Sequence, residues 1–341
     1  MSAAVLQMDY LPIEGIAERP ASWWSDVLGV ACFGKPPPLE GIPVAASMTP
    51  SLGAAAEICE VWRVRGAGDR PLTNGTPRDL AGNGCRLHYR FCEDFMFGSV
   101  CIEESSLGLF RATMAAYREI FEVIGNDRHL VRVWNYLPDI NREDDGDERY
   151  RHFNAARQAA FRSCGRPTES GVPAACALGS PAGSPISIYF LAAREAPRMV
   201  ENPRQMSAYR YPPKFGAYSP SFSRACVLSG WEGTSLFVSG TASIVGCETI
   251  HHGDVAAQTR ETVANIHALL EETNRIVGAS RYSLDGLKLK VYVRRPGDLE
   301  AIDGALCASL GAPGPIVYLQ ADVCREELLV EIEATGQSRA V

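Results

Sequence analysis

The same order of strands and helices occurs twice in this chain, and a repeat of that length allows few folds. Apolar spacing predicts a strand, an amphipathic helix, a strand, a second helix and a third strand over residues 94–104, 109–125, 129–140, 149–165 and 184–194. The same five elements are expected again over residues 234–246, 254–274, 287–299, 301–311 and 314–324. A repeat of about 110 residues is too long for a solenoid and predicts a duplicated domain.

Local sequence matches support the duplication. VWNYLPD parallels VYVRRPGD, AAFRSCG parallels GALCASLG, and SPISIYF parallels GPIVYL. The alternative is a chance recurrence of a common α/β pattern, and the matching prolines and glycines argue against it. We therefore predict an α/β (α+β) fold of two β-α-β-α-β units. The expected parts are an irregular N-terminal region around short strands (1–93), a first copy (94–205), a linker rich in tyrosine and arginine (206–225) and a second copy (226–341).

Composition excludes several classes of function. The net charge is −7, so neither nucleic acid nor an anionic membrane is expected as a partner. No long apolar run or basic leader is visible, and the 11 cysteines include no CxxC pair, which is typical of reduced thiols in a cytoplasmic protein. His251 and His252 are adjacent and point apart, so no metal site is expected.

The C-terminal strand carries the acidic triplet Glu331-Ile332-Glu333. Because side chains alternate along a strand, Glu331 and Glu333 share one face when Ile332 faces the core. A glutamate that lines a pocket can be held protonated and donate that proton. The alternative is that both glutamates are solvated. No equivalent of Glu331 is apparent in the first copy, which indicates one active site per chain, in its second half.

Three segments of the second copy, LFVSGTASI, GDVAAQTRETVANIHALLEE and LVEIEA, resemble the RidA/YjgF fold across residues 226–341. The first copy, with VWNYLPDIN (133–141) and ERYRHFNAARQAAF (148–161), is similar to the chorismatases, a RidA-related family. The resemblance covers about residues 85–336. Because RidA proteins are trimers with clefts between subunits, it implies a pseudo-trimeric, barrel-like arrangement within one chain. The N-terminal region would be the third part, and the active site would lie between the two copies. The resemblance leaves open whether the chain is a monomer or a homo-oligomer.

The resemblance also implies an activity. Chorismatases hydrolyse the enolpyruvyl ether of chorismate and release pyruvate without metal or organic cofactor. Some form 3-hydroxybenzoate, some of them with 4-hydroxybenzoate as well, and others form a dihydroxycyclohexadienoate. Glu331 would protonate the enol ether, and arginines would bind the two carboxylates of chorismate. Two alternatives are a RidA-type imine or enamine deaminase and a non-enzymatic protein that binds an aromatic acid.

Candidate substrate-binding residues lie in several segments. Tyr150 and Arg157 share one face of the helix over 149–165, although that face could simply be solvated. The linker supplies arginines and tyrosines that either contact substrate or stack on each other at the surface. One of Arg294 and Arg295 could also face the cleft. The linker candidates are Arg210, Tyr211 and Arg224.

Two further positions bear on which product forms. Gly240 and Ala242 lie where a flat ring could approach the backbone closely, or in an ordinary turn. By the resemblance, a cysteine near Cys324 accompanies the 3-hydroxybenzoate-forming type, which favours that product here. The dienoate-forming type has alanine where the benzoate-forming type has glycine. Whether Gly240 or Ala242 holds that position is open from sequence alone, and Cys324 could also be simple core packing.

Overall fold

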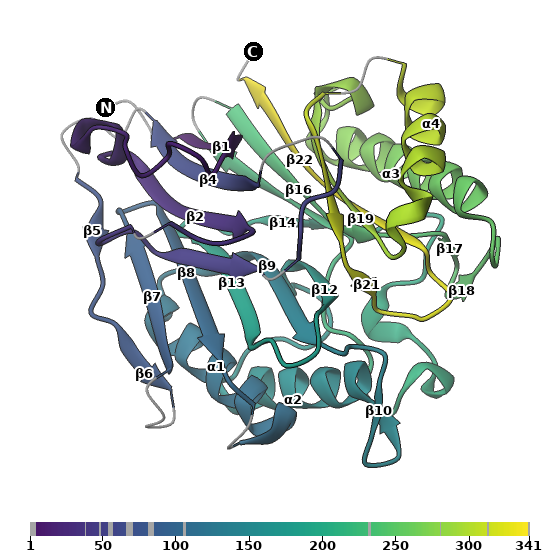
Figure 1. The fold of residues 1–341 in the computed structure, drawn as a ribbon, viewed down its shortest axis with the longest axis horizontal. Coiled ribbons are helices and arrows are strands. Elements are labelled where there is room, and N and C mark those ends of the chain that lie inside the picture. Colours follow the sequence, from purple (N-terminus) through teal and green to yellow (C-terminus); the bar gives the residue numbers. More distant parts are fainter. Residues whose placement is uncertain are drawn as a thin grey trace.

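The computed structural model describes residues 5–37, 39–47, 49–53, 57–65, 71–80, 85–104, 107–230, 233–279, 281–311 and 314–339 (Figure 1). Two large mixed sheets are each covered on one side by a pair of helices. In the first sheet the strand order is β21-β12-β9-β13-β8-β7-β5, and β6 also pairs with β7. Its strands are β5 (Thr73–Asn74), β6 (Arg78–Leu80), β7 (Cys85–Phe91), β8 (Phe95–Ile102), β9 (His129–Pro138), β12 (Ala174–Ser180), β13 (Ile186–Ala193) and β21 (Asp322–Val323).

The second sheet repeats the arrangement of the first. Its order is β14-β15-β16-β22-β19-β20, and the order β20-β19-β22-β16-β15 matches β12-β9-β13-β8-β7 strand for strand. In both sheets the first pair is parallel and the next three are antiparallel. Its strands are β14 (Arg198–Val200), β15 (Ala225–Gly230), β16 (Gly233–Thr241), β19 (Leu287–Val293), β20 (Ile316–Gln320) and β22 (Val330–Arg339).

The expected helices form close to their expected bounds. They are α1 (Gly108–Ile124), α2 (Arg149–Ser163), α3 (Val255–Val277) and α4 (Leu299–Leu310). Asp254 begins α3 because its carboxylate accepts a hydrogen bond from the Ala257 amide, and Gly278 ends it with φ of 73°. Helices α1 and α2 pack on the first sheet and α3 and α4 on the second, each pair over its own apolar core (Figure 1). In the described residues, no helix is long and apolar enough to cross a membrane.

The N-terminal region is more regular than the sequence indicated. It forms a third sheet in the order β1-β4-β2-β3, which has the pairing directions of β16-β22-β19-β20. The short 3-10 helix η1 (Ala21–Trp24), with Trp23 and Trp24, and a loop with Leu39 cover its outer apolar face in place of long helices. Through the described part of the chain the three sheets stay separate, so the expected barrel-like closure does not occur. Its strands are β1 (Val5–Pro12), β2 (Val27–Phe33), β3 (Val44–Ser47) and β4 (Ile58–Arg65).

The inner faces of the three sheets meet around a buried ion cluster. Lys290 of β19 lies 2.5 Å from the Glu60 carboxylate of β4 and 2.7 Å from the Glu333 carboxylate of β22. Arg132 of β9 lies 2.5 Å from the other oxygen of Glu333. Burial lowers the pKa of Lys290, but the two carboxylates together raise it well above its ordinary value. The cluster therefore contains at least one charged group from each of the three sheets.

We expect Lys290→Met to destabilise the protein severely. The substitution leaves the Glu60 carboxylate and Oε1 of Glu333 without a counter-ion. Removing one partner from a buried ion pair costs about 3–5 kcal/mol. Lys288→Met is the matched control, because Lys288 lies two residues earlier and pairs with the partly exposed Asp9 at 2.8 Å. That pair is worth about 0–1 kcal/mol. Urea unfolding at pH 7 measures both, and equal effects would contradict a joining role for Lys290.

Candidate active site

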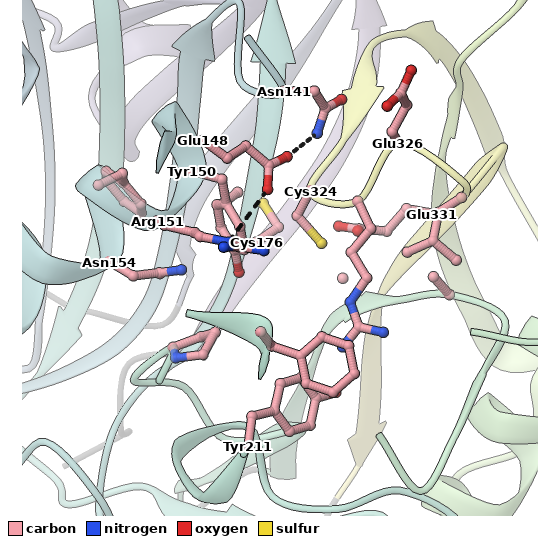
Figure 2. Close-up of a pocket in the computed structure, with 18 of the residues that line it drawn as sticks. Asn141, Glu148, Tyr150, Arg151, Asn154, Cys176, Tyr211, Cys324, Glu326 and Glu331 are labelled. Carbon is pink, nitrogen blue, oxygen red and sulfur yellow. Dashed lines mark hydrogen bonds and ion pairs between the residues drawn. The ribbon is translucent and has the colours of Figure 1, made fainter. Parts of the chain in front are cut away.

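A cavity of about 530 Å³ lies where the first unit meets the second. Helix α2, the hairpin of β10 (Glu143–Asp144) and β11 (Asp147–Glu148), and β12 form its first-unit wall. The second-unit wall comes from β16, β22 and residues 324–328, and residues 211–224 close the remaining side. Figure 2 shows side chains from both units pointing into this space. The location is the one expected for a cleft between two copies of the unit.

Glu331 lies on β22 with its carboxyl group in the cavity wall and is 4% exposed. Gly240 faces it from β16, where the ladder is irregular between Val238 and Thr241. A Cβ atom at Gly240 would lie 1.9 Å from Oε1 of Glu331, so only glycine leaves room for this carboxyl group.

The electrostatic surroundings favour the protonated form of Glu331. Burial raises its pKa to about 8, the negative charge of Glu333 adds to this shift, and Arg132 and Arg224 oppose it. Glu333 has the opposite shift, because Lys290 and Arg132 outweigh its burial and hold its pKa below the usual range. Two glutamates on one strand face therefore differ in protonation at neutral pH, and Glu331 is available as a proton donor.

Cys324 contributes a neutral thiol to the same cavity. Burial and the neighbouring Glu331 raise its pKa to about 12, so it is protonated at neutral pH and is not a nucleophilic thiolate. Cys176 of β12 also lines the cavity, and burial raises its pKa as well.

Three arginines in the cavity wall have buried N–H groups without a hydrogen-bond acceptor among the described residues. These groups are Nε and Nη2 of Arg157, Nε of Arg224 and Nη2 of Arg325. Arg224 is oriented by donating to the Tyr211 hydroxyl at 2.7 Å. Arg325 donates to the Cys247 carbonyl at 2.9 Å, and its guanidinium lies 4.0 Å from the centre of the Phe215 ring. Such donors match an anionic ligand, above all a carboxylate.

The structure brings most of the sequence-derived candidates together. Those that line the cavity are Glu331, Cys324, Tyr150, Arg157, Tyr211, Arg224, Gly240 and Ala242. Arg210 does not line it, because it is exposed on the short helix η2 (Ala208–Arg210) and lies over the Tyr209 ring. Arg294 also has another role, donating to the carbonyls of Val323, Arg325 and Leu328, and Arg295 is exposed.

Sequence reasoning missed Arg325, Glu148 and Asn141, which all line the cavity. Arg325 follows Cys324 directly, and Asn141 ends the NYLPDIN motif, so both were adjacent to recognised signals. The sequence spacing of neither residue predicts that its side chain points into the cavity. The described residues contain no group of three or more His, Cys, Asp or Glu side chains arranged to hold a metal ion.

Comparison with known proteins agrees with this geometry. The family model described as "Chorismatase FkbO/Hyg5-like, N-terminal" matches residues 75–192. A 3-hydroxybenzoate synthase of Streptomyces hygroscopicus is 40% identical over 233 residues, which is 65% of this chain and 68% of that protein. A chorismatase of Streptomyces rapamycinicus is 39% identical over 257 residues, covering 70% and 74%. The 1.08 Å crystal structure of a chorismatase superposes with a TM-score of 0.84 at 32% identity, covering 98% of this chain and 99% of that one.

The fold and the site together define an enzyme with a protonated carboxylic acid beside an arginine-lined cavity. At these identities and coverages the chain belongs to the chorismatase family.

The opposite pKa shifts of Glu331 and Glu333 predict opposite effects on stability. The raised pKa of Glu331, about 8 against about 4.3 when unfolded, stabilises the protein at pH 4, and this contribution is lost as the pH rises to 8. At pH 7 the free energy of unfolding of Glu331→Gln should therefore exceed that of wild type by up to about 4 kcal/mol. The difference should vanish near pH 4.

Glu333→Gln is the matched control on the same strand. The pKa of Glu333 is lowered by Lys290 and Arg132, so its ionised form stabilises the folded state above pH 4 and the amide should destabilise it at pH 7. Urea titrations of both variants at pH 4 and pH 7 measure the pair. A Glu331→Gln variant that is less stable than wild type at pH 7 would contradict the raised pKa.

Proposed function

We propose that this enzyme releases pyruvate from chorismate and forms 3-hydroxybenzoate. The observation that carries the proposal is the protonated Glu331 in a cavity lined by three arginines with unused donors. The names of two relatives, 3-hydroxybenzoate synthase and chorismatase, support the same substrate.

Glu331 supplies the first step of the proposed reaction. The enol ether of chorismate is inert until its terminal methylene carbon gains a proton, and protonation creates an oxocarbenium-like centre. A carboxylic acid with a pKa near the working pH is an efficient donor. Gly240 packs directly against this carboxyl group, and its lack of a side chain lets Glu331 occupy the cavity wall.

The arginines bind the two carboxylates of the substrate. Arg157 lies in the first-unit wall, and Arg224 and Arg325 lie on the other side of the cavity. Each guanidinium can bind a carboxylate through paired hydrogen bonds. Tyr150 and Tyr211 add hydroxyl groups to the same walls. This division suits a substrate with one carboxylate on its ring and one on its side chain.

Two residues favour the aromatic product over the diol. After protonation, either water attacks the side chain and leaves a diol, or a ring hydroxyl displaces pyruvate and the strained ring intermediate aromatises. Gly240 lies directly against the acid, and glycine is the residue that the resemblance associates with benzoate formation. Cys324 beside Glu331 supplies an apolar wall that limits the approach of water.

We also propose that the chain is organised as two copies, residues 94–205 and 226–341, joined by the linker 206–225 and completed by residues 1–93 as a third part. The matched strand orders of the three sheets support two copies and a third part, although β7 (Cys85–Phe91) pairs into the first sheet and β14 (Arg198–Val200) into the second. In this organisation one chain contains a complete active site, so a monomer is sufficient for activity.

The direct test is to incubate the protein with chorismate, assay pyruvate and identify the aromatic product by mass. Glu331→Gln should lower pyruvate release by about 10²–10⁴-fold, because the amide keeps the shape but has no acidic proton. Wild-type kcat/KM should fall above about pH 8, where Glu331 ionises. A variant that retains more than about a tenth of the wild-type rate would remove Glu331 from the acid role.

Turnover of amino-acid-derived imines instead of chorismate would favour the deaminase alternative, and saturable binding without turnover would favour a binding protein.

Cys324→Ala should change the product more than the rate. It removes the sulfur from the wall between acid and solvent, so water gains access to the protonated side chain. Chorismate consumption should stay within about an order of magnitude of wild type, while the diol fraction rises. Cys226→Ala is a suitable control, because Cys226 is fully buried in the central core away from the cavity. The same product ratio in Cys324→Ala as in wild type would mean that Cys324 only packs.

A further inference from the structure

A second carboxyl group, that of Glu148, lies in the cavity wall on the first-unit side. It is at the N-cap of α2, and its side chain makes no cap hydrogen bond to the helix, so the carboxylate is directed elsewhere. Its Oε1 accepts a hydrogen bond from Asn141 Nδ2 at 2.9 Å, and its Oε2 lies 3.8 Å from Arg151, beyond hydrogen-bond range. One oxygen is therefore held by a hydrogen bond, and the other has only the longer ion pair with Arg151, which Figure 2 also marks.

The contact with Arg294 fixes the orientation of the Asn141 side-chain amide. Asn141 Oδ1 accepts from Arg294 Nη1 at 3.1 Å, and an arginine can only donate. The amide nitrogen of Asn141 must then face Glu148. Arg294 also donates to the carbonyls of Val323 and Arg325, which flank Cys324. One network therefore positions Glu148 and the segment that contains Cys324.

Glu148 and Glu331 act on Cys324 from two elements. Both carboxyl groups raise the pKa of the Cys324 thiol, so both lie near it. Figure 2 shows Cys324 between the two side chains. Burial also raises the pKa of Glu148 above its ordinary value. A substrate whose side chain reaches Glu331 therefore has Glu148 within the same cavity, past Cys324.

The other acids of the cavity wall lack this arrangement. Glu143 and Glu326 are exposed, Asp147 pairs with Arg151 at 3.0 Å, and Glu327 accepts from Thr249 at 2.9 Å. Among the cavity acids in the described residues, Glu148 alone combines partial burial with an oriented amide donor and proximity to Cys324.

We propose that Glu148 is the base that accepts the proton of the ring hydroxyl when that hydroxyl displaces pyruvate. This inference depends on the proposed function. The two carboxyl groups then divide the work: Glu331 protonates the side chain, and Glu148 deprotonates the nucleophile.

The proton and electron balance closes without a co-reactant. Glu331 gives its proton to the methylene carbon, which becomes the methyl group of pyruvate. Glu148 takes the proton of the ring hydroxyl, whose oxygen bonds to the neighbouring ring carbon. The bond from that carbon to the side-chain oxygen breaks, and its electrons stay on the oxygen as pyruvate forms its carbonyl.

Aromatisation returns the carboxyl groups of Glu148 and Glu331 to their starting protonation states. Glu148 returns its proton to the bridging oxygen as the bond to its original ring carbon breaks. The ring carbon that now bears the oxygen loses its hydrogen as a proton to Glu331, and the ring becomes aromatic. The products are 3-hydroxybenzoate and pyruvate, which together contain all the atoms of chorismate, so no water is consumed.

Glu148→Gln tests the assignment. The amide still accepts from Asn141 but cannot take a proton, so formation of 3-hydroxybenzoate should fall by about 10²-fold or more. The Kd for chorismate should stay within a few-fold, and the pyruvate release that remains should be accompanied by the diol. Asp145→Asn is the matched control, because Asp145 lies at the exposed turn of the same hairpin and does not line the cavity, so its product rate should equal that of wild type.

Glu148→Asp keeps the charge and withdraws the carboxylate by one methylene, so it should retain more aromatic product than Glu148→Gln. This variant also covers the case in which the amide fails to fold. Aromatic product in Glu148→Gln within tenfold of wild type, or a loss that follows weakened chorismate binding, overturns the assignment. A wild-type enzyme that forms only the diol overturns it as well, while pyruvate release survives. A wild-type enzyme that releases no pyruvate from chorismate instead refutes the proposed function.

Discussion

The position of Lys290 between two carboxylates is the constraint on which the rest of this structure depends. A lysine with 1% of its side chain exposed is stable in charged form only if anionic groups replace its lost water. Glu60 and Glu333 provide them, and they come from different sheets. The cluster can form only when all three sheets have their final register, so it selects one packing of the chain from the many that hydrophobic contacts alone would allow.

The same cluster determines which of the two glutamates on β22 is ionised. Lys290 and Arg132 keep Glu333 ionised, and the period of the strand places Glu331 two residues away on the same face. A fixed negative charge at that distance, added to burial, makes a second ionised carboxylate unfavourable. The core therefore provides both the stability of the fold and the protonation state of the acid.

Local patterns predicted the repeated element order, the helices and Glu331, because periodicity and capping are properties of short segments. The third sheet was missed because the described part of its two crossover connections contains only the short 3-10 helix η1, so it lacks the alternation of strands and long helices that revealed the other two copies. Arg210 and Arg325 show a similar limit at the site. Both are arginines near aromatic residues, and only the path of the backbone decides that Arg325 stacks on Phe215 inside the cavity while Arg210 remains at the surface.

Strand register explains why three related sheets provide a single acid. Glu331 pairs with Tyr292 across β22 and β19, and the equivalent pairs in the other sheets are Ser187–Tyr136 and Ile58–Phe33. The position that is an acid in the second copy is therefore a serine in the first and an isoleucine in the N-terminal sheet. The first copy contributes Glu148 and Arg157 through α2 and its preceding hairpin instead. Since each copy supplies groups that the other lacks, neither can form this cavity alone, and the covalent link between them keeps the two walls at a one-to-one ratio.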